Sequence, residues 1–396
     1  MSELKPSRLA SIDVFRALTM FLMIFVNDLW TLQDVPNWLE HAAANEDGLG
    51  LADVVFPAFL FIVGLSVPFA TNQRLAKGDS EMTILKHTLL RSLALIVMGV
   101  FHVNLESYNA SAILSKPLWE ILITLAFFFI WLDYPKNLDS KRKFALEGLG
   151  IAVLLAMALV YRGGTIENPV WMKTQWWGIL GLIGWSYLIA SLLYLFFRKS
   201  LRILLMFMMF FIFFSAAEKL HWLDPFKFIQ PYFWIVSDGS LPAIVMAGIV
   251  VACVYKESLE AESKKKFFGL LISGSLVMIL ICFATRSLWG IHKIGASPSW
   301  VALCIGISGL FFVLLVWLVD INRKENWFSI LKPAGTSTLT SYLLPYFHYS
   351  IISWIGVSLP LFLRTGMIGI AKSLLYSLVI IFITGLLEKK RIRLKI

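Results

Sequence analysis

The chain has 396 residues, of which 58% are hydrophobic and only 15% are charged, and its mean hydropathy is +0.77. This composition excludes a soluble globular protein of this length and indicates a membrane protein with many spans. The net charge of +10 does not indicate a nucleic-acid partner, because the basic residues gather in the loops between apolar runs, as topology requires.

Twelve apolar runs follow one another along the chain, at about 14–31, 53–71, 88–104, 117–133, 144–161, 176–197, 201–217, 240–255, 267–285, 298–319, 336–355 and 367–387. Most have the roughly 17–25 residues that a membrane-spanning helix needs. The runs 88–104 and 117–133 are short, and 336–355 starts with the polar stretch GTSTLTSY, so we expect it to be buried among other helices. The predicted fold is all-α, a polytopic transmembrane helical bundle of about 12 helices.

The loops alternate in basic charge. Of the 35 Lys and Arg residues, 25 fall on one side of the predicted membrane and 8 on the other, and Arg16 and Lys372 lie within helices. The positive-inside rule then predicts that both termini are cytoplasmic and that the loop 32–52 faces outward. Loops of about twenty residues are too short for a soluble core, so we expect one transmembrane domain over residues 1–396.

Two further features concern processing and cysteine chemistry. No short apolar region with a small-residue cleavage site follows the N-terminus, so we expect the first helix to stay in the membrane. Cys253, Cys282 and Cys304 all lie in apolar runs. Their odd number and spacing predict small buried side chains, with neither a disulfide framework nor a metal site.

The first two runs carry polar groups where lipid disfavours them. An Asp or Arg at the centre of a membrane helix costs on the order of 2.5–3.5 kcal/mol, so such groups usually face a protein-lined site. Asp13 and Arg16 are three residues apart and therefore share a helix face and can pair. They either anchor the cytoplasmic end of the first helix, or Arg16 binds an anionic ligand that enters from the cytoplasm.

Three residues around the first outward loop have two interpretations each. Asn27 either makes an interhelical hydrogen bond or donates to a developing oxyanion. His41 is either a solvated loop residue or a general base near neutral pH, since imidazole is the side chain best suited to that work. Asp53 is either a first-turn acid that complements the helix dipole or the carboxylate that orients His41.

Later segments add weaker candidates. Glu120 is an isolated acid in an apolar run, so we expect it to face a cavity or a partner, with Lys116 and Arg286 as candidate mates. The hydroxyl-rich stretch that contains Ser341 either packs closely against another helix or lines a polar passage. The segment 286–300 combines polar groups with tryptophans, which suits either a sugar-like ligand or an interfacial belt; its candidates are Arg286, His292, Lys293 and Trp300.

Several catalytic motifs do not occur in the sequence. It contains no Walker loop, no GxGxxG after a strand, no HExxH, no GxSxG and no CxxC pair. ATP-driven transport, zinc-dependent hydrolysis and a serine-hydrolase elbow are therefore unsupported.

The segment RLASIDVFRALTMFLMIFVND, followed by EHAA and LADVVFPAFLFIVGLS, resembles the heparan-alpha-glucosaminide N-acetyltransferase family of membrane proteins. Weaker similarity follows at 177–195, at 291–300 and in PAGTSTLTSYLLPYF. The resemblance implies an acetyltransferase that takes acetyl from cytoplasmic acetyl-CoA and transfers it to the amine of a hexosamine on the far side. The family's catalytic histidine and the Asn of its V-N motif match His41 and Asn27. A Gln-Arg pair of the family has no counterpart here, and Glu120 stands near its place.

With the polar groups in the first two runs, the resemblance implies a transmembrane acetyltransferase that acts on an extracytoplasmic amino sugar or glycan, with acetyl-CoA as co-substrate and no metal. His41 would be the base, Asn27 the oxyanion donor and Asp53 the residue that orients His41. Whether transfer is direct or passes through acetyl-histidine stays open. The residues expected near the donor are Arg16, Asp13, Glu120 and Ser341, and those expected near the acceptor are Arg286, His292, Lys293 and Trp300.

The predicted location is a bacterial inner membrane, with lipid as a neighbour and a homodimer as one allowed assembly. Two alternatives remain. Other membrane acyltransferases also open their first helix with a D-x-x-R pattern, and they acylate glycans. A polytopic transporter or flippase for a sugar or lipid-linked substrate would also use buried polar groups, but without turnover of acetyl-CoA.

Overall fold

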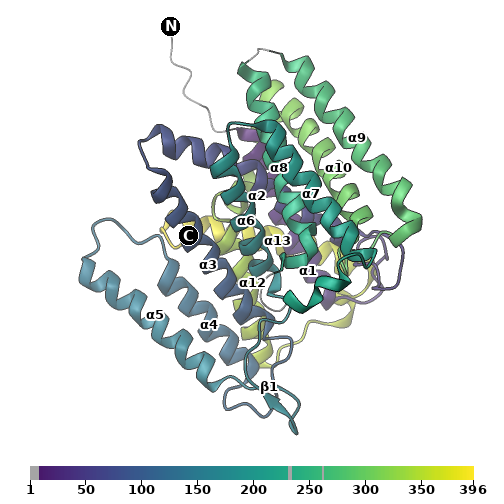
Figure 1. Ribbon diagram of the computed structural model, residues 1–396. Coiled ribbons are helices and arrows are strands. Elements are labelled where there is room, and N and C mark those ends of the chain that lie inside the picture. The colour runs from purple at the N-terminus through teal and green to yellow at the C-terminus, as the bar shows by residue number, and fades with distance from the viewer. Residues whose placement is uncertain (1–8, 231–233, 261–262) are drawn as a thin grey trace. The chain divides into compact units, whose positions relative to one another are not determined.

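The computed structural model describes residues 9–230, 234–260 and 263–396 (Figure 1). Helices dominate this part of the chain, and its one sheet is the two-stranded antiparallel pair β1 (Gly163–Gly164) and β2 (Pro169–Val170). The all-α prediction is confirmed. Lys5 and Arg8, which contribute to the charge asymmetry of the loops, lie outside the described residues.

Each of the twelve apolar runs coincides with a helix. These are α1 (Ala10–Asp28), α2 (Leu51–Ala76), α3 (Glu81–Val103), α4 (Lys116–Trp131), α5 (Ser140–Val160), α6 (Gly178–Phe197), α7 (Leu201–Lys219), α8 (Ser240–Glu260), α9 (Lys264–Trp289), α10 (Pro298–Leu315), α12 (Thr338–Ile355) and α13 (Gly366–Lys389). The short helix α11 (Lys332–Thr336) precedes α12, and α10 continues as a π-helical turn over Val316–Ile321.

Ten spans in the described part of the chain are long and apolar enough to cross a membrane, which supports an integral membrane protein. Of the twelve helices that match the apolar runs, two lie outside this set: α4, with 16 residues, and α12, which starts with the polar sequence TLTSY. Helix α4 matches run 117–133, which was predicted to be short. Helix α12 matches run 336–355, which was predicted to be buried among other helices. A short or polar helix is stable in a membrane when other helices surround it.

The chain divides into two compact units. Unit 1 contains the residues up to Val26 together with Pro36–Thr88 and Trp185–Gly335, and unit 2 contains Asn27–Val35, Leu89–Gly184 and Thr336–Ile396. Both are built from segments that are far apart in the sequence. The single domain expected over residues 1–396 stays a prediction.

In unit 1, α2 packs against α8 and α10, and α10 also packs against α9. The backbones of α2 and α8 touch at Gly64 and Gly248, where an added Cβ would overlap the carbonyl oxygens of Val245 and Phe61. Glycine at these two positions therefore lets α2 and α8 approach closely. Helix α1 joins this core through Phe15, whose ring centroid lies 5.2 Å from that of Phe311.

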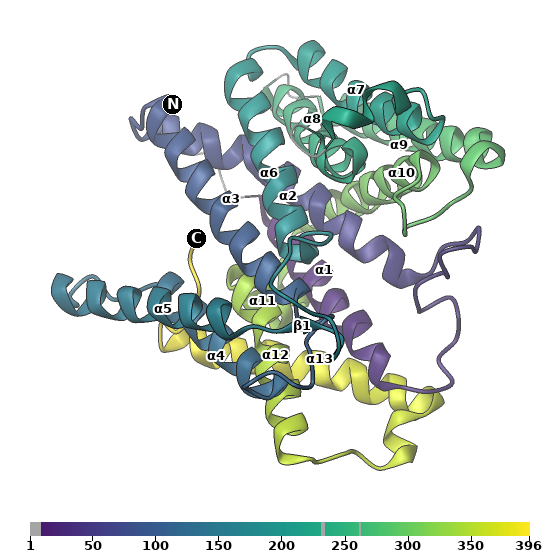
Figure 2. The same cartoon turned by 60° about the horizontal axis from the view of Figure 1, so that its bottom comes forward.

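In unit 2, α4 packs against α5 and α12, and α12 also contacts α13; Figure 2 shows α4 and α5 side by side. Trp119 of α4 is fully buried, and its indole N–H donates to the carbonyl of Met157 at 3.0 Å. A buried indole that keeps a hydrogen-bond partner fixes the register between α4 and α5 without leaving an unpaired donor.

Candidate functional site

The candidate site in unit 1 is built around Asp53, the third residue of α2. Its carboxylate is fully buried, and its Oδ2 atom accepts the backbone N–H of Gly50 at 3.0 Å. Position 50 requires glycine, because an added Cβ would overlap the carbonyl oxygen of Glu40. The start of α2 therefore brings the preceding loop back over the carboxylate, which a side chain at position 50 would prevent.

That loop carries His41 onto Asp53. The His41 Nδ1 atom lies 2.7 Å from Asp53 Oδ1, and the backbone N–H of Ala42 donates to Asp53 Oδ2 at 3.0 Å. The predicted contact between His41 and Asp53 is present. A carboxylate at Nδ1 favours the tautomer with the proton on that atom, which leaves the lone pair of Nε2 available. The imidazole is 45% exposed while the carboxylate is buried, so the ring is accessible and its orienting partner is protected.

Lys293 is the second neighbour of the imidazole. Its Nζ atom lies 3.0 Å from His41 Nδ1 and 3.1 Å from His41 Nε2. Burial lowers the pKa of the Lys293 amine, while the nearby carboxylate of Asp53 acts in the opposite direction. Of the four residues predicted to bind the acceptor, Lys293 is the one that contacts His41.

The loop that carries Lys293 is held at both ends. On one side, the Ser297 hydroxyl donates to the carbonyl of Gly290 and accepts the backbone N–H groups of His292 and Trp300. Gly290 and Gly295 have φ values of 63° and 93°, a region that glycine adopts at little cost. The turn therefore needs glycine at two positions.

On the other side, Asp47 joins this loop to the loop of His41. Its Oδ1 accepts the backbone N–H of Ile291 at 2.7 Å, and its Oδ2 accepts from Arg286 Nε at 2.8 Å. These bonds, first that of Ile291 and then that of Arg286, lower the pKa of Asp47. The sequence predicts Arg286 as an acceptor-binding residue or as a mate for Glu120. The structure instead pairs it with Asp47.

Trp300 and His292 lie behind or beside this arrangement. Trp300 is 1% exposed, and its indole N–H donates to the main-chain carbonyl of Asp53 at 3.2 Å. The structure thus places Trp300 as a support for Asp53, within the protein interior. The Nδ1 atom of His292 is buried and has no hydrogen-bond partner in the part of the chain that the structure describes.

Asn27 belongs to unit 2 and lies on the last turn of α1, with an exposed side chain. The next residue, Asp28, is 2% exposed and accepts three hydrogen bonds, from Tyr349 Oη at 2.5 Å, Lys372 Nζ at 2.6 Å and Ser373 Oγ at 2.6 Å. No role for this network was predicted from the sequence. The sequence shows only that Asp28 and Lys372, which have opposite charges, lie in two separate apolar runs. Nothing in the spacing of these two residues predicts that they pair.

Asp13 and Arg16 form the predicted pair, with Arg16 Nη1 at 3.2 Å from Asp13 Oδ1. Arg16 Nη2 also donates to the Ser66 hydroxyl on α2 at 2.7 Å. Arg16 is therefore held by two helices of unit 1, α1 and α2.

The remaining donor candidates lie in unit 2. Glu120 is half-buried on α4. Ser341 is fully buried, and its hydroxyl donates to Thr384 Oγ1 at 3.1 Å. This contact joins α12 to α13, so Ser341 takes part in the close helix packing that was one of its two interpretations.

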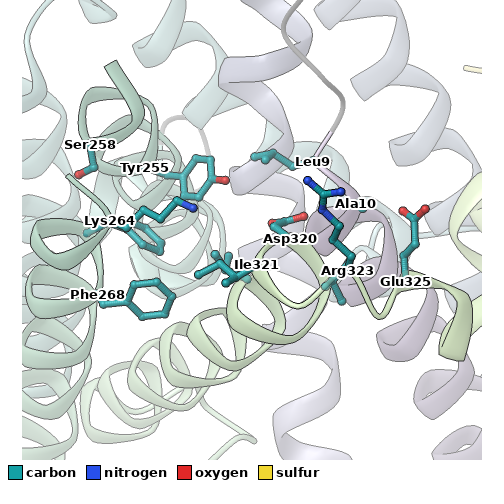
Figure 3. Close-up of a pocket in the computed structure, with 13 residues that line it drawn as sticks. Leu9, Ala10, Tyr255, Ser258, Lys264, Phe268, Asp320, Ile321, Arg323 and Glu325 are labelled. Carbon is teal, nitrogen blue, oxygen red and sulfur yellow. The ribbon is translucent and has the colours of Figure 1, made fainter. Parts of the chain in front are cut away.

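A cavity of about 450 Å³ lies at the opposite end of unit 1 from His41, among the ends of α1, α8, α9 and α10 (Figure 3). Its polar lining combines both signs of charge, from Lys264, Arg323, Asp320 and Glu325, together with the phenol of Tyr255. Asp320 Oδ1 accepts the backbone N–H of Ser11 at 3.2 Å. This bond joins the start of α1 to the end of α10.

The cysteines and the metal-ligating residue types show no clustered site in the described part of the chain. No group of three or more His, Cys, Asp or Glu residues that could hold a metal ion occurs among the described residues. The three cysteines are free; Cys282 and Cys304 are buried, as predicted, and Cys253 is half-buried.

The region that supplies Asn27, His41 and Asp53 is similar to known proteins. Residues 8–102 match the family model for the catalytic region of heparan-alpha-glucosaminide N-acetyltransferase. The human protein of that name is 38% identical over 103 residues, which are 25% of this chain and 14% of the human protein. The mouse protein is 37% identical over 102 residues, with the same two shares.

The resemblance noted from the sequence is therefore confirmed for residues 8–102. The matched region covers only 14% of the length of these curated relatives. The weaker similarities at 177–195, 291–300 and 333–347 fall outside the match, as do Lys293 and Trp300.

Proposed function

We propose, from the similarity of residues 8–102 to the catalytic region of heparan-alpha-glucosaminide N-acetyltransferase, that this membrane protein is an acetyltransferase. The donor would be acetyl-CoA, and the acceptor would be the amine of a hexosamine or of a related glycan. The observation that carries the proposal is the imidazole of His41, 2.7 Å from a buried carboxylate and within the matched region.

His41 acts as the general base in this proposal. With the proton of Nδ1 directed at Asp53, Nε2 can take a proton from the attacking amine. The buried carboxylate then stabilises the imidazolium that forms, as in other His–Asp pairs. Because two backbone N–H groups also bind Asp53, its position does not depend on the protonation state of His41.

Asn27 supplies the oxyanion donor. It lies within the matched region 8–102, its side chain is exposed, and a side-chain amide N–H can donate to the oxygen of a tetrahedral intermediate. The hydrogen bonds of Asp28 to Tyr349, Lys372 and Ser373 hold the last turn of α1. A fixed donor is worth more to catalysis than a mobile one, because it needs no reorganisation when charge develops.

The donor would be recognised at the other membrane surface. Trp300, which touches Asp53, and Asp320, which lines the cavity, are about 20 residues apart on α10 and its π-helical end, or ~30 Å at 1.5 Å per residue. This span equals the thickness of the hydrocarbon core. Lys264 and Arg323 at the cavity, and Arg16 nearer the middle of unit 1, suit the phosphates of acetyl-CoA, and the positive-inside rule assigns that surface to the cytoplasm.

The test is transfer of labelled acetyl from acetyl-CoA to glucosamine-terminated acceptors by the purified full-length protein. We expect His41→Ala to lower the rate by about 10²–10⁴-fold, the usual contribution of a general base. The matched control is His221→Ala, which removes an exposed histidine that also lies beside a carboxylate, at 3.4 Å from Asp224. A His41→Ala protein with the wild-type rate would remove His41 from the mechanism.

Sealed vesicles test the sidedness and the transporter alternative together. Acetyl-CoA should be consumed from the face that carries Lys264 and Arg323, and the acceptor should be acetylated on the face of His41. A transporter or flippase would instead move its substrate across the membrane with no consumption of acetyl-CoA. The bacterial inner membrane and a homodimer remain part of the proposal.

A further inference from the structure

We infer that Lys293 is itself an acetyl acceptor, modified on its Nζ atom with His41 as the base. The inference rests on the proposed acetyl transfer and adds a covalent modification site to it. The Lys293 amine and the amine of a hexosamine are both primary amines, so the same chemistry applies to both. Lys293 then occupies the place of the acceptor amine beside the imidazole.

The Lys293 amine lies directly beside the imidazole of the base. A general base must lie within roughly 2.6–3.2 Å of the atom whose proton it takes. Lys293 Nζ lies 3.1 Å from His41 Nε2, the ring nitrogen that Asp53 leaves available, and 3.0 Å from Nδ1. An atom at nearly equal distances from the two ring nitrogens lies over the ring face, whereas the lone pair of Nε2 points outward in the ring plane. A rotation of the Lys293 or His41 side chain, without movement of the loops, brings the amine onto that lone pair.

The surroundings also favour a reactive amine. Burial lowers the pKa of Lys293, so a larger fraction of its amine is neutral and nucleophilic than in an exposed lysine. Lys227 provides the contrast. It lies in an exposed ion pair 2.7 Å from Asp224, and its hydrogen bond to that carboxylate raises its pKa.

The loops keep Lys293 near the base. Asp47 binds Ile291 and Arg286, and Ser297 binds Gly290 and His292. Lys293 therefore extends from a short turn fixed on both sides. Local fixing of this kind raises the effective concentration of the amine at His41, which is the main contribution of proximity to catalysis.

The chemical step balances as follows. The lone pair of Lys293 Nζ attacks the carbonyl carbon of the acetyl thioester, and a C–N bond forms. The C–S bond breaks, Nζ gives its proton to His41 Nε2, and that proton passes to the sulfur of the leaving thiolate. The products are acetyl-lysine and the free thiol of CoA. The modified side chain has lost its positive charge and places an acetyl group where the acceptor amine would bind.

The experiment is incubation of the purified full-length protein with labelled acetyl-CoA without acceptor, followed by peptide mass spectrometry. We expect an acetyl group on Lys293 at an occupancy at least about tenfold above that of Lys227. The modification should be lost in Lys293→Arg and fall by about 10²-fold or more in His41→Ala, the loss expected for a general base. Excess glucosamine should slow it, because the two amines compete for one position.

The outcomes separate this inference from the proposed function. Acetylation of glucosamine by a protein whose Lys293 stays unmodified would overturn the inference and leave the proposed function intact. Equal labelling of Lys293 in wild-type and His41→Ala protein would show uncatalysed chemistry and would also overturn it. If neither glucosamine nor Lys293 is acetylated, both proposals fail.

Discussion

The Nδ1 atom of His41 lies 2.7 Å from Oδ1 of Asp53, and the backbone between them folds so that Ala42 and Gly50 also donate to the same carboxylate. One buried acid thus holds an imidazole and two backbone positions, Ala42 and Gly50, of the loop that carries it. Asp53 is held rigidly because it lies on α2, and the imidazole of His41 is accessible because it lies on the loop. The first prediction follows from this division of roles.

Replacement of Asp53 by Asn should lower the rate of acetyl transfer by about 10²–10⁴-fold, close to the loss expected for removal of the base itself. The amide has nearly the shape of the carboxylate, but it cannot stabilise an imidazolium or hold the required tautomer. The measurement is kcat and KM with acetyl-CoA and glucosamine, and KM for acetyl-CoA should change little. Asp224→Asn, at the exposed His221 pair, is the control and should retain the wild-type kcat.

The Asp28–Lys372 pair should be important for stability. Removal of one partner of a buried ion pair typically costs about 3–5 kcal/mol, because the other charge is left buried. Lys372→Met should therefore lower the midpoint of thermal unfolding in detergent strongly. The double variant Asp28→Asn with Lys372→Met should lose less than the sum of the two single changes.

The control for that prediction is an exposed pair in the same unit. Lys143 lies 3.6 Å from Glu147 one helical turn away on α5, and such pairs contribute about 0.3–0.5 kcal/mol. Lys143→Met should leave the unfolding midpoint nearly unchanged. Equal effects of Lys143→Met and Lys372→Met would contradict the assignment of Asp28 and Lys372 to a buried network.

The Asp47 link between the two loops should depend on pH in a defined direction. Hydrogen bonds from Ile291 and Arg286 lower the pKa of Asp47 below 3.8, so the link is fully present above that value and is lost as the pH falls through the lowered pKa. Hydrogen exchange of residues 290–297 should therefore be constant between pH 7 and about 5 after correction for intrinsic rates. Asp47→Asn should speed exchange there at pH 7, and no change would show that Asp47 does not hold the loop.

The contact between Gly64 and Gly248 should tolerate no side chain. Gly64→Val would push α2 away from α8, and overpacking of this kind costs about 1–3 kcal/mol. Gly274→Ala on α9 is the matched control, since an added Cβ meets no atom within 4 Å there, and it should be neutral or slightly stabilising. Thermal unfolding of both variants gives the comparison, and a Gly64→Val protein as stable as the wild type would exclude the close approach.

Much of the helical architecture was predictable from local sequence. The length and hydropathy of an apolar run decide whether it spans a membrane, and all twelve runs are helices. The pairing of Asp13 with Arg16 was also predictable, because residues three apart on a helix share a face.

The contacts that the site residues make with one another were harder to predict from the sequence. Lys293 was a candidate only as part of a polar and aromatic segment, and its contact with an imidazole 252 residues away has no local signature. Trp300 and Arg286 were expected near a ligand, whereas they bind Asp53 and Asp47. Residue type showed which side chains can make polar contacts, but not whether their partner belongs to the protein.

By itself, the sequence determined the helices, their number and the polar groups within them, because these depend on neighbours a few residues apart and on the energy of placing each side chain in lipid. The tertiary structure alone decided that Lys293 lies against His41, that Trp300 supports Asp53 and that Lys372 neutralises Asp28. Those contacts join segments separated by 252, 247 and 344 residues. They arise from the way the helices pack, which a single sequence does not encode in any local pattern.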